Sequence, residues 1–200
     1  MEKETKYDIV IFGSTGFTGD LTAKYLAKRM KEEPIRLGIA GRDEVKLNAL
    51  KKALVAIDSN CNNVGIISAD VKDNASLLRM AEDTKVVITT VGPYLKYGDP
   101  VVKACIEGRA DYLDLTGEGG FVNHVTNLYN KKAKENKVKV LNCCGFDSIP
   151  ADLGTYYTVK QLPSNEPIEV ECFVSFSSSN PSPLGQFNSV SGGTWHSAIG

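Results

Sequence analysis

A glycine-rich segment near the start of the chain has the residue types and spacing of a phosphate-binding turn. The segment reads Gly13-Ser14-Thr15-Gly16-Phe17-Thr18-Gly19. Gly13 permits a tight turn, Gly16 lets the backbone approach a pyrophosphate, and Gly19 lets a following helix lie close to the preceding strand. The N–H groups that open that helix would then face the anion. We therefore predict that these seven residues bind a dinucleotide; the alternative is a structural turn without a ligand.

The sequence on both sides of this turn has the patterns that a dinucleotide-binding fold requires. The β-branched run at 7–12 predicts a strand, and the amphipathic stretch at 21–30 predicts a helix. Strand, glycine turn and helix in this order form the first βα unit of such a fold. The spacing is GxxGxxG rather than GxGxxG, and its place between a strand and a helix is what makes it informative.

The second predicted strand indicates which dinucleotide is bound. It ends at Ala40-Gly41-Arg42, where an NAD-binding chain would carry an acidic residue for the ribose 2′-hydroxyl. Arg42 can instead stack on the adenine and pair with a 2′-phosphate, which favours NADP over NAD; the alternative is a solvated arginine. Asp70, after the third predicted strand, would either accept a hydrogen bond from the adenine amino group or cap a helix.

The loops at the carboxyl ends of the strands are the expected active-site rim, because ligands of open parallel sheets bind there. The loop after the fourth predicted strand contains Val91, Gly92 and Pro93 and would lie near the nicotinamide ribose. Two further polar loops, at 117–120 and 144–150, follow the fifth and sixth predicted strands. Three such loops on one edge of a sheet predict an active site.

The rim loops also supply the candidates for proton transfer. Glu118, Asp147 and Tyr94 are the predicted acids, bases or hydrogen-bond donors. Each of the two acids has a simpler alternative interpretation. Glu118 would be a solvated loop charge, and Asp147, together with Ser148, would only cap a helix.

Other side chains with catalytic potential are expected to have structural roles. Tyr112 falls inside a strand, where a tyrosine usually belongs to the core, and His124 and His196 are expected to be structural or exposed. Tyr156 and Lys160 are one helical turn apart, which is the spacing of the proton donor and its lysine in short-chain reductases. Those enzymes carry the pair after the fourth strand, whereas here it follows the sixth, so a chance match is the favoured interpretation.

Six short apolar runs alternate with amphipathic stretches over the first 150 residues. The predicted strands are 7–12, 35–40, 64–69, 86–91, 111–115 and 138–142, and the predicted helices are 21–30, 43–57, 74–83, 99–107 and 121–135. This alternation predicts an α/β fold, a doubly wound parallel Rossmann sheet with the strand order 3-2-1-4-5-6. Asp43 is the expected N-cap of the second helix, and Pro100 is expected near the first turn of the fourth.

The pattern changes after Pro150. A helix is predicted at 151–161, and residues 168–176 alternate with period two, which is typical of a strand with one solvated face. We therefore expect an NAD(P)-binding domain at 1–150, and at 151–200 a connecting helix and the truncated start of a second, α+β substrate domain. A strand of this kind needs partner strands, so we expect the chain to be a fragment of a longer protein.

The composition is that of an ordinary globular protein and excludes several classes. Hydrophobic residues make up 42% and charged residues 24%, and the formal net charge of −1 gives no field that attracts nucleic acid or anionic lipid. No apolar run approaches the roughly 20 residues that span a bilayer, and the charged N-terminal residues do not resemble a signal peptide. The five cysteines have neither metal-site nor disulfide-framework spacing, so reduced thiols in an intracellular protein are expected, with no metal.

Several of these motifs occur together, in the same order, in a known family. Besides the glycine turn and Ala40-Gly41-Arg42, they are Val91-Gly92-Pro93-Tyr94, Tyr112-Leu113-Asp114-Leu115-Thr116-Gly117-Glu118, Cys144-Gly145-Phe146-Asp147-Ser148-Ile149-Pro150 and Ser191-Gly192-Gly193-Thr194. Over about residues 7–200 the chain resembles the saccharopine dehydrogenase-like oxidoreductases, which include bacterial trans-acting enoyl reductases of glycolipid synthesis. The glycine turn differs from that of true saccharopine dehydrogenases, so lysine metabolism gains little support.

The resemblance implies an NAD(P)-binding domain followed by a larger substrate domain, and membrane or lipid-droplet association for some eukaryotic relatives. We therefore expect an NADP-dependent oxidoreductase that transfers a hydride to an unidentified substrate, with a lipid-linked enoyl group as one candidate. A module that binds NADP without chemistry, as a sensor or scaffold, is the alternative. The expected partners are the dinucleotide and a small-molecule or lipid substrate, and a homodimer remains open. As a fragment, the chain alone is expected to show little turnover.

Overall fold

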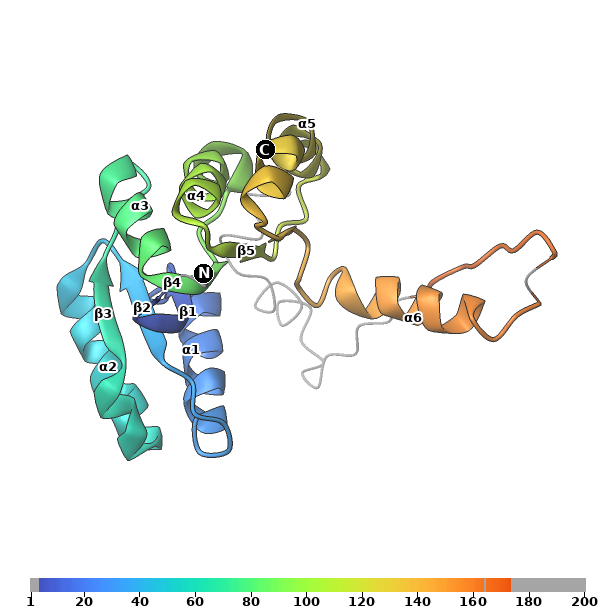
Figure 1. Cartoon of the computed structure of the whole chain (residues 1–200). Helices are drawn as coiled ribbons and strands as arrows, with labels where there is room; N and C mark the ends of the chain where they lie inside the picture. Colours follow the sequence, from blue (N-terminus) through green and yellow to red (C-terminus); the bar gives the residue numbers. More distant parts are fainter. Residues whose placement is uncertain (1–3, 164, 174–200) are drawn as a thin grey trace, which may run out of the picture.

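The chain folds around one parallel sheet, seen in the computed structural model of Figure 1, which describes residues 4–163 and 165–173. Within these residues six strands have the order β3-β2-β1-β4-β5-β6, and all neighbours pair in parallel. The strands are β1 (Tyr7–Phe12), β2 (Leu37–Gly41), β3 (Gly65–Ser68), β4 (Thr84–Thr89), β5 (Asp111–Asp114) and β6 (Val140–Leu141). The predicted doubly wound α/β fold is therefore confirmed.

Helices cover both faces of the sheet. On one face lie α1 (Phe17–Arg29) and α2 (Glu44–Ile57), and on the other, above the sheet in Figure 1, lie α3 (Asn74–Glu82), α4 (Tyr94–Gly108) and α5 (Gly119–Asn136). A 3-10 helix, η1 (Ser59–Asn63), follows α2, and α6 (Ile149–Val159) follows β6. Each face has its own core: Ile11 and Leu47 are buried on the first, and Tyr112 and Phe121 on the second.

Two helices, α1 and α4, begin a full turn or more before their predicted starts, and both changes bring helix N-termini to the rim. α1 begins at Phe17, inside the glycine turn, rather than at residue 21. α4 begins at Tyr94 rather than at residue 99, so Pro100 lies in the helix interior and not near its first turn. The predicted start of α4 is wrong because the carboxylate of Glu118, distant in sequence, accepts the N–H groups of Tyr94 and Leu95 and stabilises the earlier start.

The chain departs from the predicted strands after β5. β6 has two residues rather than the predicted five. Before it, the Val138 N–H bonds to the Ala133 carbonyl and the Lys139 N–H to the Asp111 side chain, and after it the Cys143 N–H bonds to the Asp114 carboxylate instead of continuing the ladder. Residues 168–173 form no strand, so the strand predicted over 168–176 is wrong in its described part. No described strand lies beside them to receive their ladder hydrogen bonds. The rest of that prediction and the run at 191–194 lie outside the described residues, and the second domain stays a prediction.

One row of side chains shows how far the helices cover the α1 face of the sheet. Ile39, Ile11, Ile88, Leu113 and Leu141 pair side by side from β2 to β6 and therefore point to the same face. Ile39 and Ile11 are fully buried, Ile88 and Leu113 are half-buried, and Leu141 is 45% exposed. Cover by α1 and α2 thus ends near β1, and no other described helix replaces it over β4–β6.

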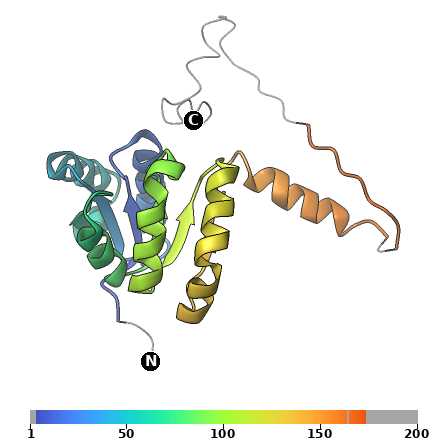
Figure 2. The same cartoon turned by 90° about the horizontal axis from the view of Figure 1, so that it is seen from above.

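The helix α6 stands apart from the sheet. It follows the loop at 142–148 and runs away from the other elements in both views (Figures 1 and 2). Leu153, Tyr156 and Tyr157 on this helix are all exposed, and it buries none of its residues. A helix with apolar side chains on several sides is usually enclosed by protein, so α6 needs cover that the described residues do not provide.

Charged side chains join three central strands at the edge opposite the glycine turn. The Asp8 carboxylate on β1 accepts hydrogen bonds from the Arg36 guanidinium at 2.8 and 3.1 Å and pairs with Lys85 on β4 at 2.9 Å. Arg36 directly precedes β2, so this one carboxylate connects β1, β2 and β4. The hydrogen bonds from Arg36 hold the pKa of the Asp8 carboxyl well below its usual range.

We predict that Asp8→Asn lowers the free energy of unfolding by about 1 kcal/mol near neutral pH, because charge-assisted hydrogen bonds are lost. A lowered folded-state pKa makes Asp8 stabilising above its unfolded pKa of about 4. That contribution declines as the pH falls below this value toward the folded-state pKa. Denaturant unfolding of parent and variant across this range should show a difference that shrinks on acidification.

The matched control is Glu33→Gln, which removes an exposed ion pair with Arg29 at 3.2 Å. Such a pair contributes little, so this variant should stay within about 0.5 kcal/mol of the parent. A stability loss in Asp8→Asn that is the same at every pH would contradict the assigned role of its charge.

Candidate dinucleotide-binding site and active-site rim

Gly13, directly after β1, occupies a position that suits glycine alone. Its φ of +84° is rarely adopted by residues with a side chain, and a Cβ atom there would lie 2.7 Å from Val91 Cγ2 and 2.9 Å from Thr90 Oγ1. The Gly13 N–H donates to the Ala40 carbonyl at 3.0 Å, and the Gly16 N–H donates to the Gly13 carbonyl at 3.0 Å. Gly13 therefore holds the ends of β1, β2 and β4 in close contact.

The start of α1 is open to an anion. Gly16 is the N-cap, and no side chain in the described part of the chain caps this helix, so the N–H groups of its first turn are available. A Cβ atom on Gly19 would overlap the Gly13 carbonyl oxygen, which shows that α1 starts in direct contact with the turn. A cradle that a Cβ would fill, at a positively polarised helix end, fits the pyrophosphate of a dinucleotide.

The other residues of the turn differ in their surroundings. Ser14 is fully buried and its hydroxyl donates to the Ala40 carbonyl at 3.2 Å, so its side chain ties the turn to β2. Thr15 and Thr18 are half-buried, and Phe17 is 72% exposed. The seven predicted dinucleotide-binding residues thus lie together, and Ser14 can offer a ligand only its backbone.

The end of β2 carries a cationic side chain that is available to an anionic ligand. Arg42 follows the strand directly and is exposed, and none of the described residues forms an ion pair with it. The neighbouring Asp43 is already engaged, because its carboxylate accepts the Lys46 N–H at 3.1 Å and pairs with Lys46 Nζ at 3.7 Å. The predicted role of Asp43 as the N-cap of α2 is confirmed.

Asp70 lies beyond β3 on the same edge of the sheet. Its Oδ1 accepts the Lys72 N–H at 2.9 Å, and its own N–H donates to Ser76 Oγ at 3.1 Å. The N-cap of α3 is Asp73, so the alternative interpretation of Asp70 as a helix cap is wrong. A contact between Asp70 and an adenine stays a prediction.

The loop after β4 packs against the glycine turn. The Thr90 hydroxyl donates to the Gly13 carbonyl at 3.1 Å, and Val91 fills the space beside the Gly13 Cα. The Gly92–Pro93 peptide is cis, and Pro93 is the N-cap of α4. The structure therefore brings Val91, Gly92 and Pro93 to the turn, and their contact with a nicotinamide ribose stays a prediction.

Glu118 is buried and bonded to backbone rather than solvated. Its two carboxylate oxygens accept the N–H groups of Tyr94 at 2.9 Å and Leu95 at 2.7 Å, in the first turn of α4. The alternative interpretation of Glu118 as a solvated loop charge is therefore wrong. Because this carboxylate already occupies the N-terminus of α4, an anionic ligand is directed to the start of α1 instead.

Two tyrosines of the rim motifs belong to the core. The Tyr94 hydroxyl donates to the Thr89 carbonyl at 3.2 Å, and its ring packs on Phe121 with 5.8 Å between centroids. Tyr112 is also buried, as predicted, and donates to Asp114 Oδ2 at 2.8 Å. Burial, reinforced by the Asp114 charge, raises the pKa of both Tyr94 and Tyr112 well above the usual range. Neither phenol gives up its proton readily in this environment.

Asp147 is the accessible acid of the rim. It is exposed in the loop after β6, and one of its oxygens lies 3.2 Å from where a Gly117 Cβ would be, so the loops after β5 and β6 meet there. Ser148 is the N-cap of α6, but no side chain caps this helix in the described residues. The alternative interpretation, in which Asp147 and Ser148 only cap a helix, is therefore wrong.

The remaining candidate pairs lie away from the rim. Tyr156 is on the outlying α6 and Lys160 is its C-cap residue, with the ammonium 4.8 Å from the exposed tyrosine ring. His124 is exposed on α5, as predicted, with Nε2 2.8 Å from Asp99 Oδ1. His196 lies outside the described residues. No cluster of three metal-ligating side chains occurs among the residues that the structure describes.

Asp114 is an acidic residue of the rim that is absent from the predicted site residues. It is 1% exposed at the carboxyl end of β5, and four donors converge on its carboxylate. The signal that could have revealed it is its place two residues after Tyr112, on the same buried side of the strand. An acid at such a position must be hydrogen-bonded, so the loops beside it had to supply donors.

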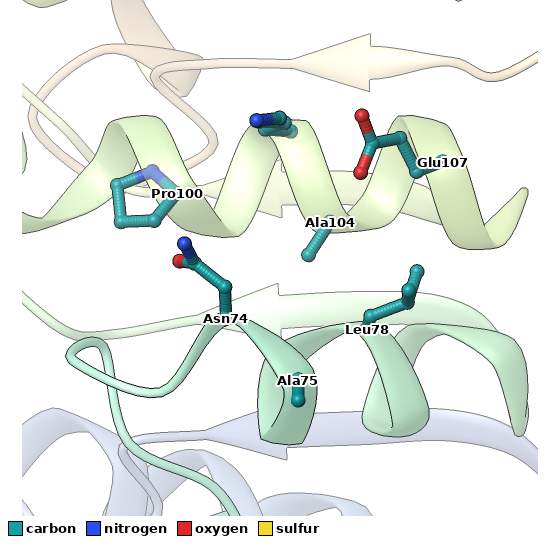
Figure 3. Close-up of a pocket in the computed structure, with 7 residues that line it drawn as sticks. Asn74, Ala75, Leu78, Pro100, Ala104 and Glu107 are labelled. Carbon is teal, nitrogen blue, oxygen red and sulfur yellow. The ribbon is translucent and has the colours of Figure 1, made fainter.

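Two surface pockets of the described residues lie away from the rim. A cavity of about 180 Å³ lies between α3 and α4, lined by residues such as Asn74, Leu78, Pro100, Ala104 and Glu107 (Figure 3). A second, of about 490 Å³, is lined by Lys6, Tyr7, Met30 and Arg36 near the opposite edge of the sheet. A dinucleotide on the glycine turn would lie along the carboxyl edge of the sheet, as in other doubly wound sheets.

Comparison with known proteins agrees with this geometry. Residues 9–141 match the model of the family described as the saccharopine dehydrogenase NADP binding domain. The chain belongs to this family. It is therefore an NADP-binding domain of an oxidoreductase family, and the resemblance noted in the sequence is confirmed. No helix in the described residues is long and apolar enough to cross a bilayer.

The curated relatives of this saccharopine dehydrogenase-like chain are longer than it is. It is 39% identical to the saccharopine dehydrogenase-like oxidoreductase of Mus musculus, over 98% of this chain and 46% of that one. It is 40% identical to the lipid droplet localized protein of Caenorhabditis elegans, over 79% and 37%. It is 41% identical to the trans-acting enoyl reductase of Mycobacterium tuberculosis, over 76% and 35%. The chain spans less than half the length of these relatives.

A solved structure shares the fold. Apo saccharopine dehydrogenase (L-Glu forming) from Saccharomyces cerevisiae superposes with a TM-score of 0.62 over 78% of this chain and 31% of that one. The sequence identity is 21%, so this likeness supports the fold alone.

We predict that Glu118→Gln lowers the free energy of unfolding by about 1–2 kcal/mol, because one of the two backbone N–H groups at the start of α4 loses its acceptor. Denaturant unfolding near neutral pH measures this loss. Glu107→Gln is the control, since it removes only an exposed pair with Lys132 at 3.0 Å. Equal stability of the two variants would refute the capping role.

Proposed function

We propose that this chain is the cofactor domain of an NADP-dependent oxidoreductase in which a hydride passes between the nicotinamide and a bound substrate. The observation that carries the proposal is the open N-terminus of α1 on the glycine turn, followed by an exposed Arg42 at the end of β2 that forms no ion pair with any described residue. The first suits a pyrophosphate and the second a 2′-phosphate. When bound, NADPH supplies the hydride.

Each loop of the rim would hold a different part of the cofactor. The backbone of Gly13–Gly19 would bind the pyrophosphate, and Arg42 would bind the 2′-phosphate with its guanidinium fork. Asp70 would accept a hydrogen bond from the adenine amino group. Val91–Pro93, which pack on the turn, would line the nicotinamide ribose.

The three residues predicted for proton transfer would have separate roles. Asp147 is exposed where the β5 and β6 loops meet, and it is the acid that a substrate could reach. Glu118 would act by orienting the start of α4 and the loop before it. Tyr94 would stay protonated, because burial raises its pKa, and would support the same loop through Thr89.

A lipid-linked enoyl group is the substrate class that we favour. Phe146 and Ile149, on either side of Asp147, are 81% and 36% exposed, so the accessible acid lies in apolar surroundings. The relatives named a trans-acting enoyl reductase and a lipid droplet localized protein support an apolar substrate and an association with lipid surfaces.

A second candidate function is an NADP-binding sensor or scaffold without chemistry. It is favoured by the engagement of Glu118 and Tyr94 in structural hydrogen bonds. The full-length protein, incubated with NADPH and a panel of enoyl and imine substrates, separates the two candidates. Oxidation of NADPH that depends on a substrate supports the enzyme, and none across the panel supports the sensor.

We predict that the parent protein binds NADP more tightly than NAD, and that Arg42→Ala removes this preference. Loss of a charge-assisted contact with the 2′-phosphate should weaken NADP binding by about tenfold or more and leave NAD binding unchanged. Calorimetric titration of both nucleotides measures this. Arg79→Ala on α3, whose exposed pair with Asp73 spans 4.0 Å, is the matched control. Equal affinities of the parent for NADP and NAD would refute the role of Arg42.

We also predict that Tyr156→Phe leaves any reductase activity unchanged, because Tyr156 and Lys160 are exposed on α6. Initial rates of NADPH oxidation by parent and variant test this. A variant without activity, but with parental stability and NADPH affinity, would instead favour a proton donor of the tyrosine–lysine type.

A further inference from the structure

The four loops at the carboxyl edge of the central strands are connected in series by side-chain hydrogen bonds. Thr90 connects the loop after β4 to the glycine turn through the Gly13 carbonyl, at 3.1 Å. Glu118 connects the loop after β5 to the start of α4, through two backbone N–H groups. Asp114 connects the loops after β5 and β6.

Asp114 makes the largest number of these connections. Its Oδ1 accepts the N–H groups of Thr116 at 3.1 Å and Cys143 at 3.0 Å. Its Oδ2 accepts the Tyr112 hydroxyl at 2.8 Å and the Asn142 amide at 2.6 Å, and its backbone carbonyl accepts the Cys144 N–H at 2.8 Å. A carboxylate is required here, because four donors face it and only an acceptor with two oxygens can satisfy them.

The same network continues from Asp114 toward the cofactor side. The N–H of Thr116 bonds to Asp114, and the Thr116 hydroxyl accepts the N–H of Glu118 at 3.0 Å. Glu118 in turn holds the N-terminus of α4, next to the loop that packs on Gly13. Thr116 is fully buried, so this path lies beneath the rim and away from water.

On the side of β6, Asp114 controls where the chain leaves the sheet. Cys143 has a φ of +60°, an uncommon conformation for a residue with a side chain. The bonds from Cys143 and Cys144 to Asp114 hold this turn in place. The accessible acid Asp147 follows three residues later, so the position of Asp147 depends on the same turn.

We propose that Asp114 is a positioning residue that holds the loops after β5 and β6 in the arrangement required by the nicotinamide half of the site. The proposal rests on the proposed function and deepens it. Asp114 is 1% exposed, so it would act through the loops and not by touching cofactor or substrate. Its loss should therefore weaken contacts made by the rim beyond β4 and spare contacts made by the glycine turn and Arg42.

Two ligands test the two halves of the site separately. NADPH would engage the whole rim, whereas 2′,5′-ADP carries only the adenosine half and the 2′-phosphate. We expect Asp114→Asn to weaken NADPH binding by about tenfold, since the amide places a donor against donors, and to leave 2′,5′-ADP binding within about twofold of the parent. Fluorescence titration of the intact protein measures both affinities.

A thiol readout tests the connection without any cofactor. Cys143 and Cys144 are half-buried, and burial, followed by the Asp114 charge, raises the pKa of both thiols; Asp147 adds to the effect on Cys143. In a Cys172→Ser background, which removes the exposed cysteine, Asp114→Asn should shift the pH profile of thiol labelling to lower pH.

Asp111→Asn is the matched control. Asp111 lies at the other end of β5 and accepts the Lys139 N–H at 2.8 Å, so it too joins the segments of β5 and β6, but at the far edge. This variant should keep the NADPH affinity and the labelling profile of the parent. Asn142→Ala removes one donor and keeps the carboxylate, so it should weaken NADPH binding and spare 2′,5′-ADP binding. This variant tests the positioning role if Asp114→Asn does not fold.

The outcomes distinguish the two proposals. A parent that binds neither NADPH nor 2′,5′-ADP would overturn the proposed function and, with it, the positioning role. A folded Asp114→Asn that binds NADPH as the parent does, or that loses both ligands equally, would overturn the positioning role alone. Selective loss of NADPH together with the shifted thiol profile supports it.

Discussion

The structure depends on a close approach of backbones that glycine alone allows. Gly13 turns the chain with a positive φ, and its missing side chain leaves room for Val91 and Thr90 from the neighbouring loop. Gly19 lets α1 begin directly on the Gly13 carbonyl. The strand, the helix and the β4 loop therefore meet at one point, where no side chain of the described residues caps the first N–H groups of α1. Any bulkier residue would separate these elements and remove the anion site that they form together.

Buried carboxylates fix the conformation of the loops after β4, β5 and β6, as glycine does for the turn after β1. Loops carry backbone N–H groups that no ladder satisfies, and burying them without acceptors would be costly. Glu118 and Asp114 supply these acceptors beneath the rim, for α4 and for the turn at Cys143. Asp8 has a similar role at the opposite edge, with Arg36 and Lys85 as partners. Most of these acids are therefore engaged in structural hydrogen bonds. For this reason Asp147 is the accessible one of the two acids predicted for proton transfer.

Local patterns predicted the features that local forces decide. The glycine turn and the Asp43 cap follow from neighbouring residues, and the strand order follows from the alternation of strands and helices together with the topology rules of parallel sheets. The start of α4, the end of β6 and the burial of Glu118 were not recoverable. Glu118 meets Tyr94 across 24 residues and Asp114 meets Cys143 across 29, and no short-range signal reports such pairs. Errors in helix and strand limits therefore fell on the loops that carry the candidate site.

The two halves of the rim differ in how far this domain completes them. On the side of the glycine turn, β1, β2, α1 and the β4 loop pack on one another. These elements can therefore bind a dinucleotide without help from a further domain. The β6 side ends in exposed apolar residues, with Leu141 at the sheet, Phe146 in the loop and Leu153 on α6. Exposed apolar surface of this extent usually meets a ligand or another part of a protein. We therefore expect recognition of the adenosine half and the pyrophosphate of the cofactor to reside in the glycine turn and its neighbours, and substrate choice to depend on what covers the apolar side next to Asp147.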